Sequence, residues 1–185
     1  LRLFRALAGR VDLAVGISSD ISTQLHDVLR VPSDRIRVIS NSRDPDSYRP
    51  PADGEARPKD AAQILFVGEL EVGKRPDLFL DVVAALRRQG VSASAAMVGR
   101  GSLGPSLQSR ADDLGVAMLG SREDVPALLR HADVLVVTSA PDTEGMPGVA
   151  IEAGLSAVPA VSTAAAGVTD VVEHGVTGYV VESDR

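Results

Sequence analysis

From residue 63 onward the chain alternates short apolar runs with amphipathic segments of about ten residues, and this alternation most restricts its fold. The amphipathic segments often begin near Pro and end before Gly, as helices do. Strands this apolar are typical of a parallel sheet covered on both faces, so we predict an α/β fold with a Rossmann-like, doubly wound parallel sheet. Ligands of such sheets bind beyond the carboxyl ends of the strands. The expected strands are 63–67, 94–98, 116–119, 134–138, 160–162 and 178–181, and the expected helices are 76–89, 105–114, 125–132, 147–156 and 169–174.

The first 40 residues follow a separate pattern. An apolar run at 11–18 precedes a helix capped by Ser19, and 35–40 alternates like a strand. Two strands and one helix cannot bury both faces of a parallel sheet. We therefore expect residues 1–40 to be the remnant of a preceding α/β domain and the chain to be a fragment.

A proline-rich stretch separates the two patterns. Residues 41–62 hold four prolines among Asp, Ser, Arg and Gly, which is typical of a linker. The expected organisation is thus the remnant, this linker, and one domain over 63–185.

Charge and composition exclude several classes of function. Twenty-five acidic against nineteen basic residues give a net charge of -6, so nucleic acid is not an expected partner. The chain has no cysteine, which excludes thiol chemistry and is compatible with the cytoplasmic location that we expect. No apolar run has the ~18 to 20 residues that cross a bilayer, and membrane association is left open.

The loop from a predicted strand into the helix at 147–156 carries two carboxylates, Glu144 and Glu152, separated by seven residues. Gly145 and Gly148 permit close approach of a ligand to the backbone, and the amides at the helix start favour a phosphate. Glu152 would lie roughly 7 to 8 Å along the helix axis, so the two carboxylates can bracket a diphosphate. Because the neighbours of Glu152 are apolar, we expect ligand hydroxyls to satisfy its carboxylate. The alternative is that both are surface charges.

Three further segments are candidate ligand contacts. Lys74 and Arg75 precede the helix at 76–89 and could reach phosphate oxygens, or form a solvated pair. The glycine-rich turn at 99–101 is of the nucleotide-binding type but is weak by itself. Small residues at 162–167 allow either close ligand approach or tight packing. The three histidines lack metal-ligand spacing, so no metal site is expected.

The order of these motifs resembles the donor domain of retaining GT-B glycosyltransferases of family 4, also called glycosyl transferases group 1. The resemblance runs from about residue 11 to the end and is most specific in the two glutamates. It implies that Glu152 accepts hydrogen bonds from the ribose of a nucleotide sugar and that Glu144 faces the transferred sugar. It also implies that Lys74 neutralises the diphosphate of a UDP- or GDP-linked hexose, with no bound metal and no other cofactor. The remaining donor contacts implied are Gly68, Arg75, Gly99, Arg100, Gly101, Ser121, Arg122, Gly145, Met146, Pro147, Gly148 and Val149.

The chain departs from this family in three respects. Glu69 stands where the family usually has Arg and would repel a diphosphate, unless Arg75 compensates. Ala166 replaces one of a frequent pair of glycines. The family's N-terminal acceptor domain and its returning terminal helix are missing, so we expect the isolated chain to be inactive. A non-catalytic module that binds nucleotide or phosphate, and a sugar-nucleotide epimerase of the same architecture, remain as alternatives.

Overall fold

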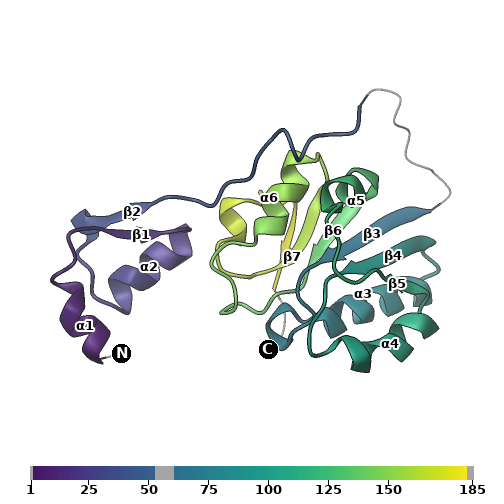
Figure 1. Ribbon diagram of the computed structural model, residues 1–185, viewed down its shortest axis with the longest axis horizontal. Coiled ribbons are helices and arrows are strands. Elements are labelled where there is room, and N and C mark those ends of the chain that lie inside the picture. Colours follow the sequence, from purple (N-terminus) through teal and green to yellow (C-terminus); the bar gives the residue numbers. More distant parts are fainter. Residues whose placement is uncertain (1, 53–60, 183–185) are drawn as a thin grey trace.

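A computed structural model describes residues 2–52 and 61–182 and contains a six-stranded parallel sheet (Figure 1). Its strand order, β5-β4-β3-β6-β7-β8, is that of a doubly wound nucleotide-binding sheet, which confirms the predicted fold class. The chain leaves the neighbouring strands β3 and β6 toward opposite edges of the sheet, so the topological switch point lies between them. The strands are β3 (Ala62–Val67), β4 (Ala93–Val98), β5 (Val116–Met118), β6 (Val134–Val137), β7 (Ala160–Thr163) and β8 (Gly178–Val181).

Helices cover both faces of this sheet (Figure 1). On one face α3 (Pro76–Arg88) and α4 (Gly104–Asp113) pack on side chains such as Phe66, whose ring centroid lies 5.6 Å from that of Phe79. On the other face α5 (Val125–His131) and α6 (Gly148–Leu155) pack on Leu65 and its neighbours. Because successive residues of a strand point to opposite faces, the continuous apolar runs fill two cores.

Two local predictions were wrong. Ser18, not Ser19, caps helix α2 (Ser19–Asp27), since its hydroxyl accepts a hydrogen bond from the Ile21 amide. The helix expected at 169–174 is only a 3-10 turn, η3 (Val168–Asp170). The Glu173 amide donates to the Thr177 hydroxyl, and this bond forms a turn where the next helical turn would stand.

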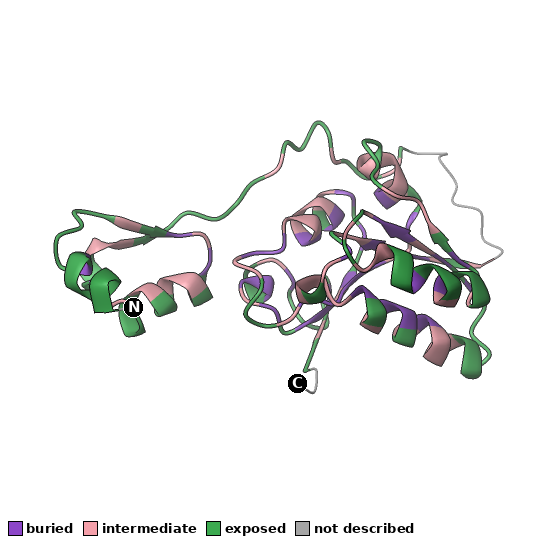
Figure 2. Ribbon diagram, turned by 60° about the horizontal axis from the view of Figure 1, so that its bottom comes forward, coloured by how far each residue is buried: buried purple, intermediate pink, exposed green. Residues whose placement is uncertain are grey.

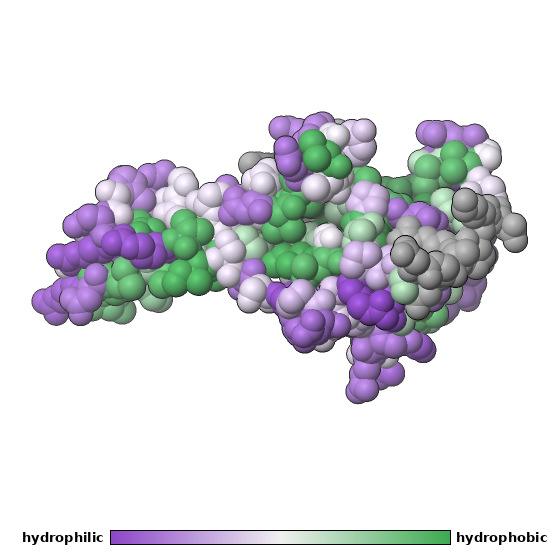
Figure 3. Space-filling view, turned by 90° about the horizontal axis from the view of Figure 1, so that it is seen from above, coloured by the Kyte–Doolittle hydropathy of each residue, from purple (hydrophilic) through white to green (hydrophobic). Residues whose placement is uncertain are grey.

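The N-terminal segment forms a small separate sheet, β1 (Ala14–Gly16) paired in parallel with β2 (Ile36–Val38). Helix α1 (Arg2–Ala8), α2 and the 3-10 turn η1 (Ser33–Arg35) accompany it, and most of its residues are exposed (Figure 2). Apolar surface is visible on this segment from above (Figure 3). None of the helices within the described ranges has the length and apolarity to cross a membrane.

A stretch without helix or strand, 39–52, joins the two parts; of the predicted linker, residues 53–60 lie outside the described residues. The start of α2 is tied to the larger unit by reciprocal bonds. The Ser19 amide and hydroxyl donate to Asp170 at 2.7 and 2.6 Å, and the Gly167 amide donates to Asp20 at 2.8 Å. The N-terminal segment is therefore fixed against the loop that follows β7.

Candidate donor-binding site

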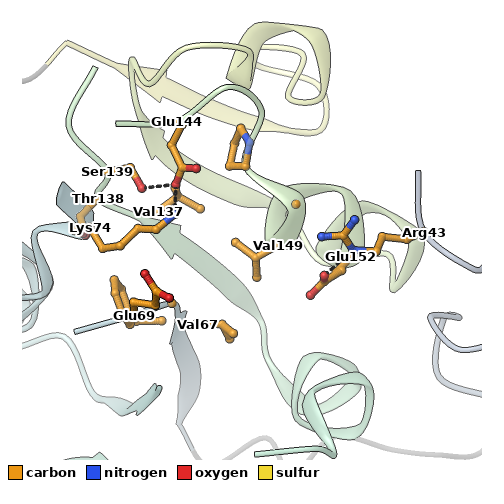
Figure 4. Close-up of a pocket in the computed structure, with 14 residues that line it drawn as sticks. Arg43, Val67, Glu69, Lys74, Val137, Thr138, Ser139, Glu144, Val149 and Glu152 are labelled. Atoms are coloured by element: carbon orange, nitrogen blue, oxygen red, sulfur yellow. Dashed lines mark hydrogen bonds and ion pairs between the residues drawn. The ribbon is translucent and has the colours of Figure 1, made fainter. Parts of the chain in front are cut away.

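A cavity of about 400 Å³ lies beyond the carboxyl ends of β3 and β6, at the switch point of the sheet (Figure 4). Because both strands end here, the residues that follow them come together although they are far apart in sequence. The lining residues are Arg43, Phe66, Val67, Gly68, Glu69, Lys74, Val137, Thr138, Ser139, Glu144, Pro147, Gly148, Val149 and Glu152.

One end of the cavity holds an ion pair between Lys74 and Glu144. Lys74 ends the 3-10 turn η2 (Val72–Lys74) after β3, and Glu144 belongs to the loop after β6. The Ser139 hydroxyl donates to the same carboxylate oxygen at 2.7 Å. The carboxylate is only 11% exposed, so an ammonium group and a shielded carboxylate stand together where a ligand would bind.

The other end holds Glu152, the fifth residue of α6, as the sequence spacing predicts. Arg43 donates from Nε to Glu152 Oε1 at 2.6 Å, and the Glu152 side chain is 13% exposed. The pKa of Tyr48 is raised by burial first and then by the negative charge of the nearby Glu152. Arg43, a residue of the linker, thus already pairs with Glu152 in the absence of a ligand, and the expectation that ligand hydroxyls bind this carboxylate stays a prediction.

Helix α6 begins between the two ion pairs (Figure 4). Its cap, Pro147, provides no side-chain hydrogen bond, and Gly148 and Val149 line the cavity. The first amides of a helix and its dipole favour an anion at that point. The cavity thus combines a helix start with three carboxylates and two cations.

Other predicted contacts lie elsewhere. Met146 is buried, and a Cβ on Gly145 would come within 2.7 Å of Ile17, so both pack on protein. Arg75 has a left-handed backbone, φ 48°, and lines a different cavity with Leu78 and Val82. Arg75 and Glu69 therefore line different cavities.

The residues predicted near the base are also separate from the main cavity. Gly99, Arg100 and Gly101 line a second cavity of about 580 Å³ beside α4. Ser121 is exposed, and the exposed Arg122 pairs with Asp124 at 2.7 and 2.6 Å. Within 2–52 and 61–182, no cluster of His, Cys, Asp or Glu has a geometry for a metal ion.

A parallel doubly wound sheet with a charged cavity at its switch point defines a Rossmann-like ligand-binding unit. The profile of the family described as Glycosyl transferases group 1 matches residues 61–185. The chain therefore belongs to this glycosyltransferase family.

The relatives that this chain resembles are longer than it is. It is 32% identical over 161 residues to a D-inositol 3-phosphate glycosyltransferase of Mycobacterium sp. strain JLS, covering 80% of this chain and 36% of the relative. It also resembles Anabaena HepE in complex with UDP, with 26% identity and a TM-score of 0.82, over 98% of this chain and 53% of HepE. HepE in complex with UDP-glucose aligns with a TM-score of 0.80. The chain thus spans about a third of the curated relatives and about half of HepE.

Proposed function

We propose that this chain supplies the donor site of a glycosyltransferase that moves a hexosyl group from a UDP- or GDP-sugar to an acceptor, with retention of configuration. The observation that carries the proposal is the cavity at the switch point, where Lys74, Glu144, Glu152 and the start of α6 converge. The UDP complex of HepE, at 26% identity, supports a nucleotide as the ligand. The acceptor would bind to a preceding domain of a longer, cytoplasmic protein.

In this proposal each end of the cavity has its own task. Glu152 accepts hydrogen bonds from the two ribose hydroxyls, and the amides at the start of α6 bind the diphosphate. Lys74 stabilises the negative charge that develops on the departing diphosphate, so the reaction needs no bound metal. Glu144, held by Lys74 and Ser139, faces the transferred sugar.

Calorimetric titration of the chain with UDP, GDP, ADP and UDP-glucose tests this proposal. We expect one diphosphate to bind selectively, and Glu152→Ala to weaken it by about 1.5 to 3 kcal/mol, the value of a hydrogen bond to a charged group. Binding that is unchanged in the variant would refute the ribose role. If none of the four ligands binds, a donor site in this chain is refuted.

A second candidate is a module that binds nucleotide or phosphate without chemistry, and the observation in its favour is Glu69. This carboxylate lines the cavity and would repel a diphosphate. In that case Glu144 would be dispensable, so a longer protein carrying Glu144→Ala would behave as the wild type does. An epimerised sugar after incubation with UDP-N-acetylglucosamine would instead indicate an epimerase.

A further inference from the structure

The charges around the cavity are not matched to a diphosphate. Three carboxylates, Glu69, Glu144 and Glu152, line it together with two cations, Arg43 and Lys74. Each carboxylate repels an entering diphosphate, and Lys74 is already paired with Glu144. The second cation, Arg43, is likewise paired, with Glu152, and comes from the linker and not from the sheet.

Arg43 lies where it can reach both a carboxylate and a phosphate. Gly148 and Glu152 are four residues apart and so share one face of α6. Arg43 is bonded to Glu152 and also lies against Gly148, where a Cβ would collide with Nη2 of the guanidinium. A cation beside the positive end of a helix is unfavourable unless an anion stands between them. In the free chain the Glu152 carboxylate offsets this charge, and an anion bound at the start of α6 would lie beside the same guanidinium.

Glu152 has different partners in the two states: Arg43 in the free chain and, in the proposed function, the ribose in the nucleotide-bound chain. In the structure, Oε1 of Glu152 accepts the Arg43 bond. Ribose hydroxyls that bind Glu152 compete with the guanidinium for this oxygen. Where the ribose hydroxyls take Oε1, Arg43 exchanges its partner, and the nearest site that attracts a cation would be the diphosphate at the start of α6.

From this geometry, and resting on the proposed donor site, we propose that Arg43 is a specificity-determining residue that selects diphosphates. Its guanidinium pairs with Glu152 in the free chain and moves to the diphosphate when a nucleoside diphosphate binds, which frees Glu152 for the ribose. A nucleoside, which has no phosphate, breaks the Arg43–Glu152 pair without providing another anionic partner for Arg43. The residue therefore rejects nucleosides and retains diphosphates.

The test compares Arg43→Ala with the wild type in titrations with UDP and uridine, or with GDP and guanosine if the wild type prefers GDP. We expect the variant to bind the diphosphate about 10- to 100-fold more weakly, because a charged hydrogen bond is lost. The nucleoside should bind as well as before or more tightly, because Glu152 is vacant. The affinity of Arg43→Lys for the diphosphate should lie between the affinities of the wild type and Arg43→Ala. Arg49→Ala, which removes the same charge from an exposed position of the same segment, should match the wild type.

The outcomes separate this inference from the proposed function. If the wild type binds neither ligand, the donor site itself is refuted and Arg43 has no such role. If the wild type binds and the ratio of the two dissociation constants is unchanged in Arg43→Ala, only the role of Arg43 is refuted. If Arg43→Ala bound both ligands more tightly by the same factor, Arg43 would only compete with them for Glu152. If it bound both more weakly by the same factor, Arg43 would have a structural role. Either result overturns the proposal. Thermal melts of each variant establish that it folds.

Discussion

Lys74 and Glu144 are 70 positions apart in the sequence and form an ion pair beyond the carboxyl ends of two neighbouring strands. Lys74 follows β3 and Glu144 follows β6, so the strand order of the sheet alone makes them neighbours. The Lys74 side chain is 28% exposed and lines the cavity. An anionic ligand would therefore meet a cation that is already held in place.

Lys74→Ala should weaken binding of UDP or GDP by about 1.5 to 3 kcal/mol and leave the corresponding nucleoside nearly unchanged. The variant removes the cation and also leaves Glu144 as an uncompensated negative charge close to the diphosphate. Calorimetry with the diphosphate and the nucleoside measures both losses. Arg88→Ala, at the exposed end of α3, is the control with the same change in net charge. Equal losses of affinity for the two ligands would refute the proposal that Lys74 binds the diphosphate.

Glu152→Gln should instead weaken the nucleoside and the diphosphate alike, because the ribose is common to both ligands. It should also lower the free energy of unfolding by about 1 to 3 kcal/mol, since a partly buried guanidinium loses the negative charge that pairs with it. A double variant with Arg43→Ala should recover part of this stability, as coupled neighbours do. Denaturant unfolding of the wild type, the two single variants and the double variant measures these free energies. Stabilities that simply add would show that the Arg43–Glu152 pair contributes nothing to folding.

Much of the fold could be predicted because hydrophobic periodicity depends on local sequence. The buried runs of β3 and β6 and the start of α3 at Pro76 follow from residues close in sequence. The helix expected at 169–174 failed because a side chain, Thr177, competes for a backbone amide. Hydrophobic periodicity carries no information about such competition.

The two ends of the candidate site differ in how far the sequence could reveal them. Lys74 and Glu144 stood in strand-to-helix loops, and Glu152 in the helix that follows one of them, where a doubly wound sheet binds ligands, so topology indicated them. Arg43 and Tyr48 belong to the linker, and Arg43 meets Glu152 across 109 positions. No spacing or local pattern predicts that contact, because it depends on the path of the linker over the sheet.

Gly167 and Gly154 should respond in opposite ways to alanine. Gly167 has φ +73°, and a Cβ there would collide with the Gly145 carbonyl oxygen and approach Ser18 Cβ to 2.9 Å. Gly167→Ala should therefore destabilise the chain by about 2 to 4 kcal/mol and loosen the loop that holds α2. Gly154 lies in α6 with nothing within 4 Å of its Cβ position, so Gly154→Ala should stabilise by about 0.5 to 1 kcal/mol. Thermal melts test both, and a stable Gly167→Ala would contradict the crowding at this position.

The carboxylate of Glu71 joins the loop after β3 to the loop after β4. It accepts hydrogen bonds from the Ser102 hydroxyl and the Ser102 amide, both at 2.6 Å. These bonds, the hydroxyl first, lower the pKa of Glu71 from its usual value of 4.5. A carboxyl whose pKa is lower in the folded state stabilises the fold above the unfolded value and loses this contribution as the pH falls through the folded value.

Glu71→Gln should accordingly reduce the melting temperature near neutral pH, and the difference from the wild type should vanish as the pH falls below 4.5 through the lowered pKa of Glu71. Ser102→Ala should reduce the same acid dependence, because it removes the first cause of the shift. The double variant should lose less than the sum of the two single losses, since both substitutions affect the bond between the Ser102 hydroxyl and Glu71. Melting curves over the acid range measure these differences. A difference that persists unchanged in acid would mean that Glu71 stabilises the loops without its charge.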